Sequence, residues 1–266
     1  MSLVRALLLG LWLWHVAGVA AAFDHTHAAW TTLLRKHVVL ADGGRASRVD
    51  YTAFAAERKA LTAYLDTLKA VTPAEYDGWA RAQKLAFLIN AYNAFTVEKV
   101  LTRYPGLASI RDFGTVFGNP WKDKFFTLLG RAQNLDGIEH GMIRVKGVFD
   151  EPRIHFAVNC ASIGCPMLRE EAYVADRLDA QLEEQTRRFL GDRTRNRLRG
   201  GALEVSQIFD WYGDDFKAAA GSVPGYLARY ADLLGEDPAD RTALRSGRVK
   251  LDTLDYDWKL NDTRTR

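Results

Sequence analysis

The sequence RAQKLAFLINAYNAFTVEKVLTRYP occupies residues 81–105 and contains the strongest helix pattern in the chain. Between Leu85 and Val97 apolar residues fall on nearly every face of this helix, and a helix that is apolar all round is a buried one. Pro105 cannot continue a helix, so we expect the helix to end before it. The segment therefore predicts a central helix that the rest of the fold encloses.

The segments on either side of this helix are short and mostly helical by their apolar spacing. We expect further helices at 24–40, 51–71, 135–145, 169–189, 208–220 and 223–234. Strands are expected in a hairpin turning at Gly130 and Arg131, at 153–160, in a Gly-Gly hairpin within 196–206, and at an edge within 249–261. This order predicts a single α+β domain, with helices packed around a small, mainly antiparallel sheet with hairpins.

The first 22 residues, MSLVRALLLGLWLWHVAGVAAA, have the pattern of a signal peptide. Arg5 precedes an apolar run, and Ala20 to Ala22 offer a small-residue cleavage site. The run is too short for a comfortable membrane span, although an uncleaved anchor is the alternative. We therefore expect a periplasmic or secreted protein with no stable membrane span after cleavage.

Composition and charge narrow the classes of partner. The chain has 266 residues, of which 48% are hydrophobic and 26% charged, and its formal charge is +3. Such a composition is globular. Removal of the signal peptide takes away Arg5 alone among the charged residues, so the mature charge is close to neutral. A nearly neutral exported chain is not expected to bind nucleic acid.

The segment RIHFAVNC, residues 153–160, alternates in polarity like a strand. The alternation places Arg153, His155 and Asn159 on one face and Cys160 on the other. A straight strand would therefore keep His155 and Cys160 apart, whereas a bend at Asn159 would let them pair. The polar face, including Arg153 and Asn159, is a candidate binding surface.

Cys160 and Cys165 are the two cysteines of the chain, and four residues separate them. In an exported protein they could form a disulfide, if their Cα atoms lie within about 7 Å. Alternatively, Cys160 could be a catalytic nucleophile, provided that its thiol pKa is lowered. Two thiols do not complete a zinc site, and we predict no metal and no cofactor there.

Four more residues are candidates for a role at the same site. His140, on the predicted short helix, is an alternative catalytic base, and Asp210 could orient a histidine as the third member of a triad. Asn90 and Asn93 lie three residues apart on one face of the central helix. They could bind a substrate amide, or they could tie the helix to neighbouring backbone.

A weak metal-binding possibility lies at the expected mature N-terminus. Cleavage after Ala22 would place His25 third in the chain. A free amine, two amide nitrogens and this imidazole could bind Cu(II) in a square plane. We expect any such binding to be incidental.

Five motifs in order resemble the DUF547 domain family. They are FLINAYNAF, LDGIEHGMIR, PRIHFAVNCASIGCP, FDWYGDDF and YDWKLN, and together they extend over about residues 80–261. The resemblance implies an exported bacterial member of a family without an assigned activity. We expect a signal peptide at 1–22, an N-terminal helical segment at 23–79, and a DUF547-like core at 80–262 of the same domain.

Two hypotheses on function follow. The first is a thiol-dependent hydrolase or acyltransferase that acts on an amide in the cell envelope, with Cys160 as nucleophile and His155 or His140 as base. The alternative is a non-catalytic periplasmic binding or assembly domain, in which a disulfide joins Cys160 and Cys165. In both cases the expected partner is an unidentified envelope peptide or small molecule.

Overall fold

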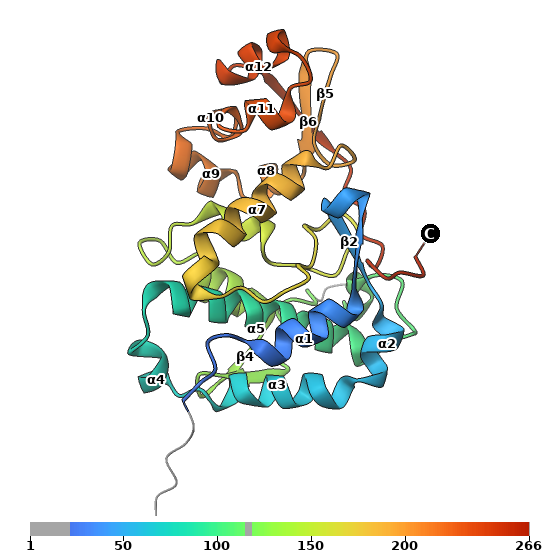
Figure 1. The fold of residues 1–266 in the computed structure, drawn as a ribbon, viewed down its shortest axis with the longest axis vertical. Helices are drawn as coiled ribbons and strands as arrows, with labels where there is room; N and C mark the ends of the chain where they lie inside the picture. Colours follow the sequence, from blue (N-terminus) through green and yellow to red (C-terminus); the bar gives the residue numbers. More distant parts are fainter. Residues whose placement is uncertain (1–21, 115–118, 266) are drawn as a thin grey trace, which may run out of the picture.

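The computed structural model describes residues 22–114 and 119–265. The predicted signal peptide at 1–22 lies outside these residues, apart from Ala22. Helices dominate, and small sheets accompany them (Figure 1). The predicted α+β class is confirmed. Within the described residues, no helix combines the length and the apolar character that crossing a membrane requires.

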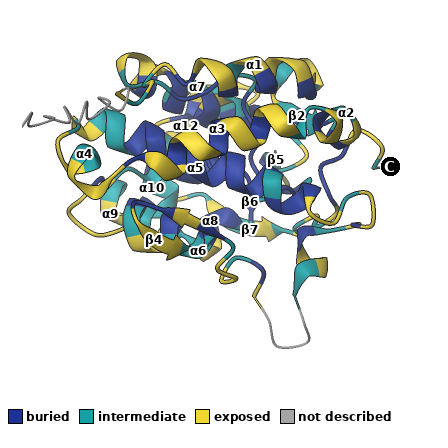
Figure 2. Ribbon diagram, turned by 90° about the horizontal axis from the view of Figure 1, so that it is seen from below, coloured by how far each residue is buried: buried dark blue, intermediate teal, exposed yellow. Residues whose placement is uncertain are grey.

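Helix α5, Arg81–Leu101, is the buried centre of the N-terminal half. Figure 2 shows it as the most deeply buried long helix, with α3 beside it. Leu85 to Val97 are all buried, as their apolar pattern predicted. The surrounding helices are α1 (Ala28–His37), α2 (Tyr51–Ala56), α3 (Arg58–Ala70) and α4 (Pro73–Asp77).

The strands form three separate small sheets instead of the single sheet that we expected. Two are hairpins, β1 (Val38–Ala41) with β2 (Ala46–Val49), and β3 (Phe126–Leu128) with β4 (Arg131–Gln133). In the third, β6 (Ala202–Ser206) pairs antiparallel with β5 (Arg197–Arg199) and parallel with β7 (Lys250–Leu254). Each strand has only three to five residues, so the helices make most of the core.

The C-terminal half has a hydrophobic cluster of its own. Phe189, Phe209, Phe216 and Tyr226 are among its buried members. The helices around it are α7 (Leu178–Gly191), α8 (Ile208–Trp211), α9 (Gly213–Ala220), α10 (Val223–Ala228), α11 (Ala231–Leu234) and α12 (Pro238–Arg245). In Figure 1 this half lies at the opposite end of the molecule from α1 and α3.

The predicted strand at 153–160 is wrong. Residues Pro152–Phe156 form a 3-10 helix that Glu151 caps by accepting a hydrogen bond from the Arg153 backbone. The following residues, 157–160, form an irregular loop. Both faces of the supposed strand are buried, because His155 and Asn159 of the polar face are as inaccessible as Ile154 and Phe156 of the apolar face. Ile154 packs in the first hydrophobic cluster and Phe156 in the second, so the segment connects two cores.

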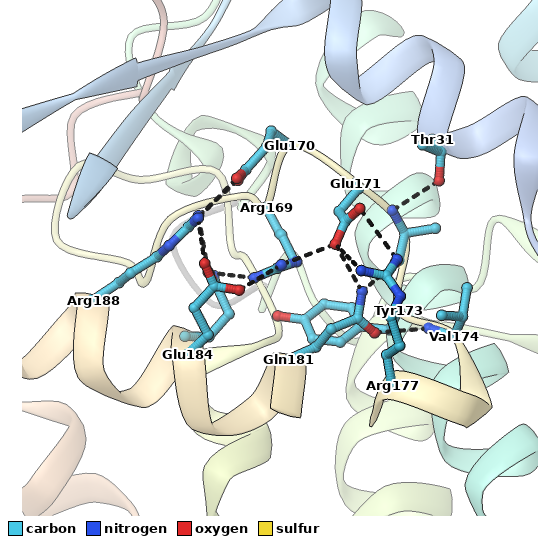
Figure 3. A network of polar contacts seen from close by, with 12 residues as sticks. Thr31, Arg169, Glu170, Glu171, Tyr173, Val174, Arg177, Gln181, Glu184 and Arg188 are labelled. Carbon is cyan, nitrogen blue, oxygen red and sulfur yellow. Dashed lines mark hydrogen bonds and ion pairs between the residues drawn. The ribbon is translucent and has the colours of Figure 1, made fainter. Parts of the chain in front are cut away.

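The predicted helix at 169–189 begins later, at Leu178, because polar contacts hold residues 169–174 in an irregular conformation (Figure 3). Arg169 donates hydrogen bonds to Glu171 at 2.9 Å and to Glu184 of α7 at 2.7 Å. Burial alone would raise the pKa of Glu171, but hydrogen bonds from Arg177 and Arg169 outweigh it and hold the pKa down to about 2. The network ties this segment to α7.

The last described residues return to the N-terminal half. The backbone N–H of Asn261 donates to Ala161, and the N–H of Leu260 donates to Ala108. The backbone N–H of Thr263 donates in the same way to the carbonyl of Val49. The C-terminal segment thus crosses the loop that carries the cysteines and fixes its position.

Candidate functional site

One cavity of about 290 Å³ contains the chemistry-bearing side chains. It lies where the 155–165 segment meets the start of α6 (Leu135–Ile138), the α8 region and the C-terminal segment. Its lining residues are Tyr92, Asn119, Trp121, Asp136, Glu139, His140, His155, Val158, Cys160, Cys165, Ile208, Trp211, Tyr212, Tyr256 and Trp258. Three of the four residues predicted as catalytic, Cys160, His155 and His140, therefore share one cavity.

The sulfur of Cys160 is surrounded by hydrogen-bond donors. The Ser162 hydroxyl lies 3.0 Å from it and the Tyr256 hydroxyl 3.3 Å. The Cys165 thiol also bonds to it. Burial raises the pKa of Cys160, but the hydrogen bonds outweigh burial and lower the pKa to about 7. A large fraction of this thiol is therefore thiolate at neutral pH, and the thiolate is the nucleophilic form.

Local backbone bonds hold the cysteine loop in its shape. Ala161 has a positive φ of 62°, and its N–H donates to the Asn159 side chain at 2.9 Å. The Asn159 amide in turn donates to the carbonyl of Pro166 at 2.7 Å. A Cβ at Gly164 would lie 3.0 Å from the Tyr256 ring, so glycine allows Tyr256 to approach the sulfur.

Cys165 is the less reactive partner. Both cysteines are free thiols in the structure, so it does not contain the predicted disulfide. The backbone N–H of Cys160 donates to the Cys165 sulfur at 2.8 Å. Burial, together with the charge and hydrogen bond of Cys160, raises the pKa of Cys165 well above its usual value. Cys165 thus stays protonated and donates to the thiolate of its neighbour.

His155 is a fully buried imidazole held by a carboxylate. Its Nε2 lies 2.7 Å from Oδ2 of Asp215, on α9, and its ring stacks on Tyr212 at 3.9 Å between centroids. Burial opposes ionisation of Asp215, but hydrogen bonds from His155 and Arg144 outweigh it and lower the pKa of this carboxyl strongly. Asp215 is therefore an acceptor, which places the proton of neutral His155 on Nε2.

The other nitrogen of His155 is left available. Nδ1 is buried and has no hydrogen-bond partner in the described residues. Burial lowers the pKa of His155, while the bond to Asp215 acts in the opposite direction. The ring is thus neutral at pH 7, with Nδ1 as a free base. No hydrogen bond between Nδ1 and Cys160 is found, and such bonds are commonly long in unliganded sites.

His140 lies at the exposed rim of the cavity, in a π-helix over Glu139–Ile143 that continues α6. Its Nδ1 accepts a hydrogen bond from Arg144 at 2.6 Å, and its Nε2 lies 3.8 Å from Asp136. His140 is therefore nearer to solvent than His155 and has no carboxylate at hydrogen-bonding distance. Of the two histidines, His155 has the geometry of an oriented base.

The structure leaves five predicted residues out of the cavity lining. One is Asn159, whose buried side chain bonds the backbone of residues 161 and 166 and holds the cysteine loop instead of a ligand. Asn90 bonds both backbone groups of Tyr173, and Asn93 bonds the backbone of residues 157 and 159, so both tie the helix to neighbouring chain. Arg153 is paired with Glu151 and Asp179. Asp210 is exposed on α8 and does not line the cavity. Asp215 holds His155 in the place proposed for Asp210.

His25 lies far from this chemistry. It packs edge-on against Trp79, with 4.5 Å between ring centroids. Within the described residues, no group of three or more histidine, cysteine or acidic side chains is arranged to hold a metal ion. Copper binding through the free amine at an inferred N-terminus stays a prediction.

For several residues at the site, the sequence patterns predicted no role. They are Glu139, Ser162, Trp211, Tyr212, Asp215, Tyr256 and Trp258. Most belong to the quoted motifs FDWYGDDF and YDWKLN. In both motifs a Tyr or Trp stands beside an Asp, and this recurrence could have indicated that the two motifs belong to one site.

Comparison with known proteins gives a family match over part of the chain and no activity. Residues 76–190 match the model of a family described as a protein of unknown function, DUF547. The match contains α5, the 3-10 helix with His155, and both cysteines. No curated protein matches the chain, and no solved structure matches it. The resemblance to the domain family is thus supported over this segment, while export and bacterial origin stay predictions.

Proposed function

We propose that this protein, whose central segment matches a domain family of unknown function, is a thiol-dependent hydrolase or acyltransferase acting on an amide. The observation that carries the proposal is the shared cavity. It is lined both by a thiol whose pKa is lowered to about 7 and by a buried histidine that a carboxylate orients. A nucleophile, a base and a group that orients the base are the parts of a catalytic triad.

In the proposed reaction, Cys160 is the nucleophile and His155 the base. The thiol proton passes to Nδ1 of His155 as sulfur bonds to the amide carbonyl carbon. The C–N bond then breaks, and His155 returns the proton to the leaving amine, which gives a thioester. Water or a second acceptor attacks the thioester, loses a proton to His155, and releases the acyl group as the C–S bond breaks. Asp215 keeps the ring in the required tautomer throughout.

The acylation step can be tested without the natural substrate. p-Nitrophenyl acetate supplies an activated acetyl group, and intact-protein mass spectrometry detects the acetylated enzyme. We expect one acetyl group on Cys160 of the wild-type protein and none on Cys160→Ser. Absence of acetylation on Cys160 in folded wild-type protein would overturn the proposal.

The roles of the histidine and the acid need a matched pair of variants. Asp215→Asn should slow acetylation by up to about 10⁴-fold, since that is the loss when the orienting acid of a triad becomes an amide. Asp210→Asn is the control, because Asp210 is a nearby exposed acid outside the cavity. His155→Gln should remove the fall in rate at low pH that protonation of Nδ1 causes. Equal rates in Asp215→Asn and Asp210→Asn would contradict the triad.

A non-catalytic envelope domain with a Cys160–Cys165 disulfide is the second proposal. It is favoured by the close approach of the Cys165 sulfur to the backbone of Cys160, at 2.8 Å. Protein purified from an oxidising compartment would then weigh two protons less before reduction than after it. Complete recovery of two free thiols from such a preparation would exclude this role and would favour the enzyme.

A further inference from the structure

The cavity described above has an unbalanced set of charges. Its lining includes the carboxylic acids Asp136 and Glu139, and no lysine or arginine among the described residues. The two histidines are the remaining ionisable bases, and burial lowers the pKa of His155. The thiolate of Cys160 adds further negative charge at neutral pH. Anions are therefore disfavoured in this cavity and cations are favoured.

Glu139 has an unused hydrogen-bond acceptor inside this cavity. The residue is only 5% exposed, and its Oε1 is buried without a partner in the described structure. Burial raises the pKa of the neighbouring Tyr212 hydroxyl, and the charge of Glu139 and a hydrogen bond to its carboxyl group raise this pKa further, so the unpartnered oxygen is Oε1 alone. A buried carboxylate oxygen without a partner destabilises the folded protein, because its desolvation is not compensated. A ligand that donates a hydrogen bond from a cationic nitrogen would remove that cost.

Aromatic rings form the outer wall. Tyr256 lies 4.8 Å from Trp211 and 4.5 Å from Trp258 between ring centroids, and Trp121 lies 6.0 Å from Trp258. The faces of such rings attract cations, most strongly for tryptophan. Arg111 already stacks over Trp258 at 5.2 Å.

Arg144, which lies beside the cavity, is already paired. Arg144 stacks over Tyr212 at 4.7 Å, but it donates to Asp215 at 2.7 Å and to His140 at 2.6 Å. It does not line the cavity. Burial lowers the pKa of Arg144 and the charge of Glu139 helps to raise it, but among the described residues no arginine or lysine forms a direct ion pair with Glu139.

We infer that the cavity selects a substrate with a cationic nitrogen group, an ammonium or a guanidinium, held by Glu139 and the aromatic wall next to the acyl group that Cys160 attacks. That the bound ligand is a substrate rests on the proposed function. The cation site itself rests on the lining charge, the unpaired oxygen and the rings. In a peptide substrate the group would be a basic side chain or an amino terminus.

Three small molecules of similar size test the selectivity. n-Butylammonium, 1-butanol and butyrate differ mainly in charge, and the tryptophans of the wall report binding through their fluorescence. We expect n-butylammonium to bind the wild-type protein about tenfold more tightly than 1-butanol, since a partly desolvated cation–π contact contributes about 1–2 kcal/mol. Butyrate should not bind. Equal affinity for the alcohol and the ammonium would overturn the inference.

Two acidic residues provide a matched pair of variants. Glu139→Gln should weaken n-butylammonium binding by about tenfold, whereas Asp136→Asn, whose residue is nearer to solvent, should change it by less than about threefold. A larger loss in Asp136→Asn than in Glu139→Gln would contradict the assignment. Should Glu139→Gln fail to fold, the selectivity of the wild-type protein still decides the matter.

The cation site and the enzyme proposal can fail separately. Cys160→Ser cannot form the thioester but keeps Glu139 and the aromatic wall, so it should still bind n-butylammonium. Binding in this variant without any acetylation of the wild-type protein would leave the cation site and refute the enzyme. Acetylation of the wild-type protein without cation selectivity would refute the cation site alone.

Discussion

The hydroxyl of Tyr256 is expected to set the reactivity of Cys160, and Tyr256→Phe tests this. The hydroxyl lies 3.3 Å from the sulfur and is one of the side-chain donors that lower its pKa to about 7. A hydrogen bond to a charged acceptor contributes about 1.5–3 kcal/mol, and one pKa unit corresponds to about 1.4 kcal/mol. Loss of one donor should therefore raise the thiol pKa by about one unit.

The rate of alkylation by iodoacetamide between pH 5 and 10 measures this pKa. In a Cys165→Ser background only Cys160 can react, and the serine hydroxyl keeps a donor at position 165. At pH 7 the thiolate fraction should fall from about one half to about one tenth in Tyr256→Phe. Ser162→Ala should act in the same direction, because its hydroxyl lies 3.0 Å from the sulfur. An unchanged midpoint in both variants would refute the role of these donors.

Three further predictions concern stability and packing. His27 is buried, and burial lowers its pKa to about 4 from an unfolded value near 6.5. Between pH 4 and pH 6.5 the unfolded chain therefore binds more protons than the folded chain. Stability should fall by on the order of 3 kcal/mol as the pH drops from about 6.5 to 4, and unfolding by urea should show that His27→Gln removes most of this loss. Asn90→Ala leaves two buried backbone groups unpaired and should cost about 2–4 kcal/mol in the same assay; a loss below about 0.5 kcal/mol would contradict a structural role. Gly164→Ala brings a Cβ to 3.0 Å from the Tyr256 ring and should slow alkylation of Cys160, whereas Gly141→Ala, with open space around its Cβ, should not.

Elements with a local cause were predictable from the sequence. Helix α5 follows from apolar residues on nearly every face of residues 85–97. The β5–β6 hairpin follows from Gly200 and Gly201, which both have positive φ. These signals act within a few residues, so no tertiary contact is needed to interpret them.

The segment at 153–160 shows where such reasoning fails. Its alternation of polar and apolar residues resembles a strand with one buried face, but the polar His155 and Asn159 are buried as well. Ile154 packs on one side and Phe156 on the other, while Asn93 binds the backbone at 157 and 159. The tertiary contacts thus override the local pattern.

Which aspartate contacts His155 depends on where helix α8 ends. A single helix over 208–220 drew attention to Asp210 as a partner for a histidine. The chain instead breaks at Tyr212, whose φ of −115° separates α8 from α9. This break leaves Asp210 exposed on α8 and brings Asp215 to His155. Cys160, His155 and His140 were predicted because each lies in an unusual motif, and the three residues line one cavity.

The return of the C-terminal segment to the cysteine loop bears on how the protein matures during translation. Tyr256 follows Cys160 by 96 residues, which takes about 5–20 seconds of synthesis at common elongation rates. Over that interval the emerging thiol lacks one of the donors that lower its pKa. The thiolate of Cys160 is therefore less populated until Tyr256 has been synthesised and has reached the cysteine loop.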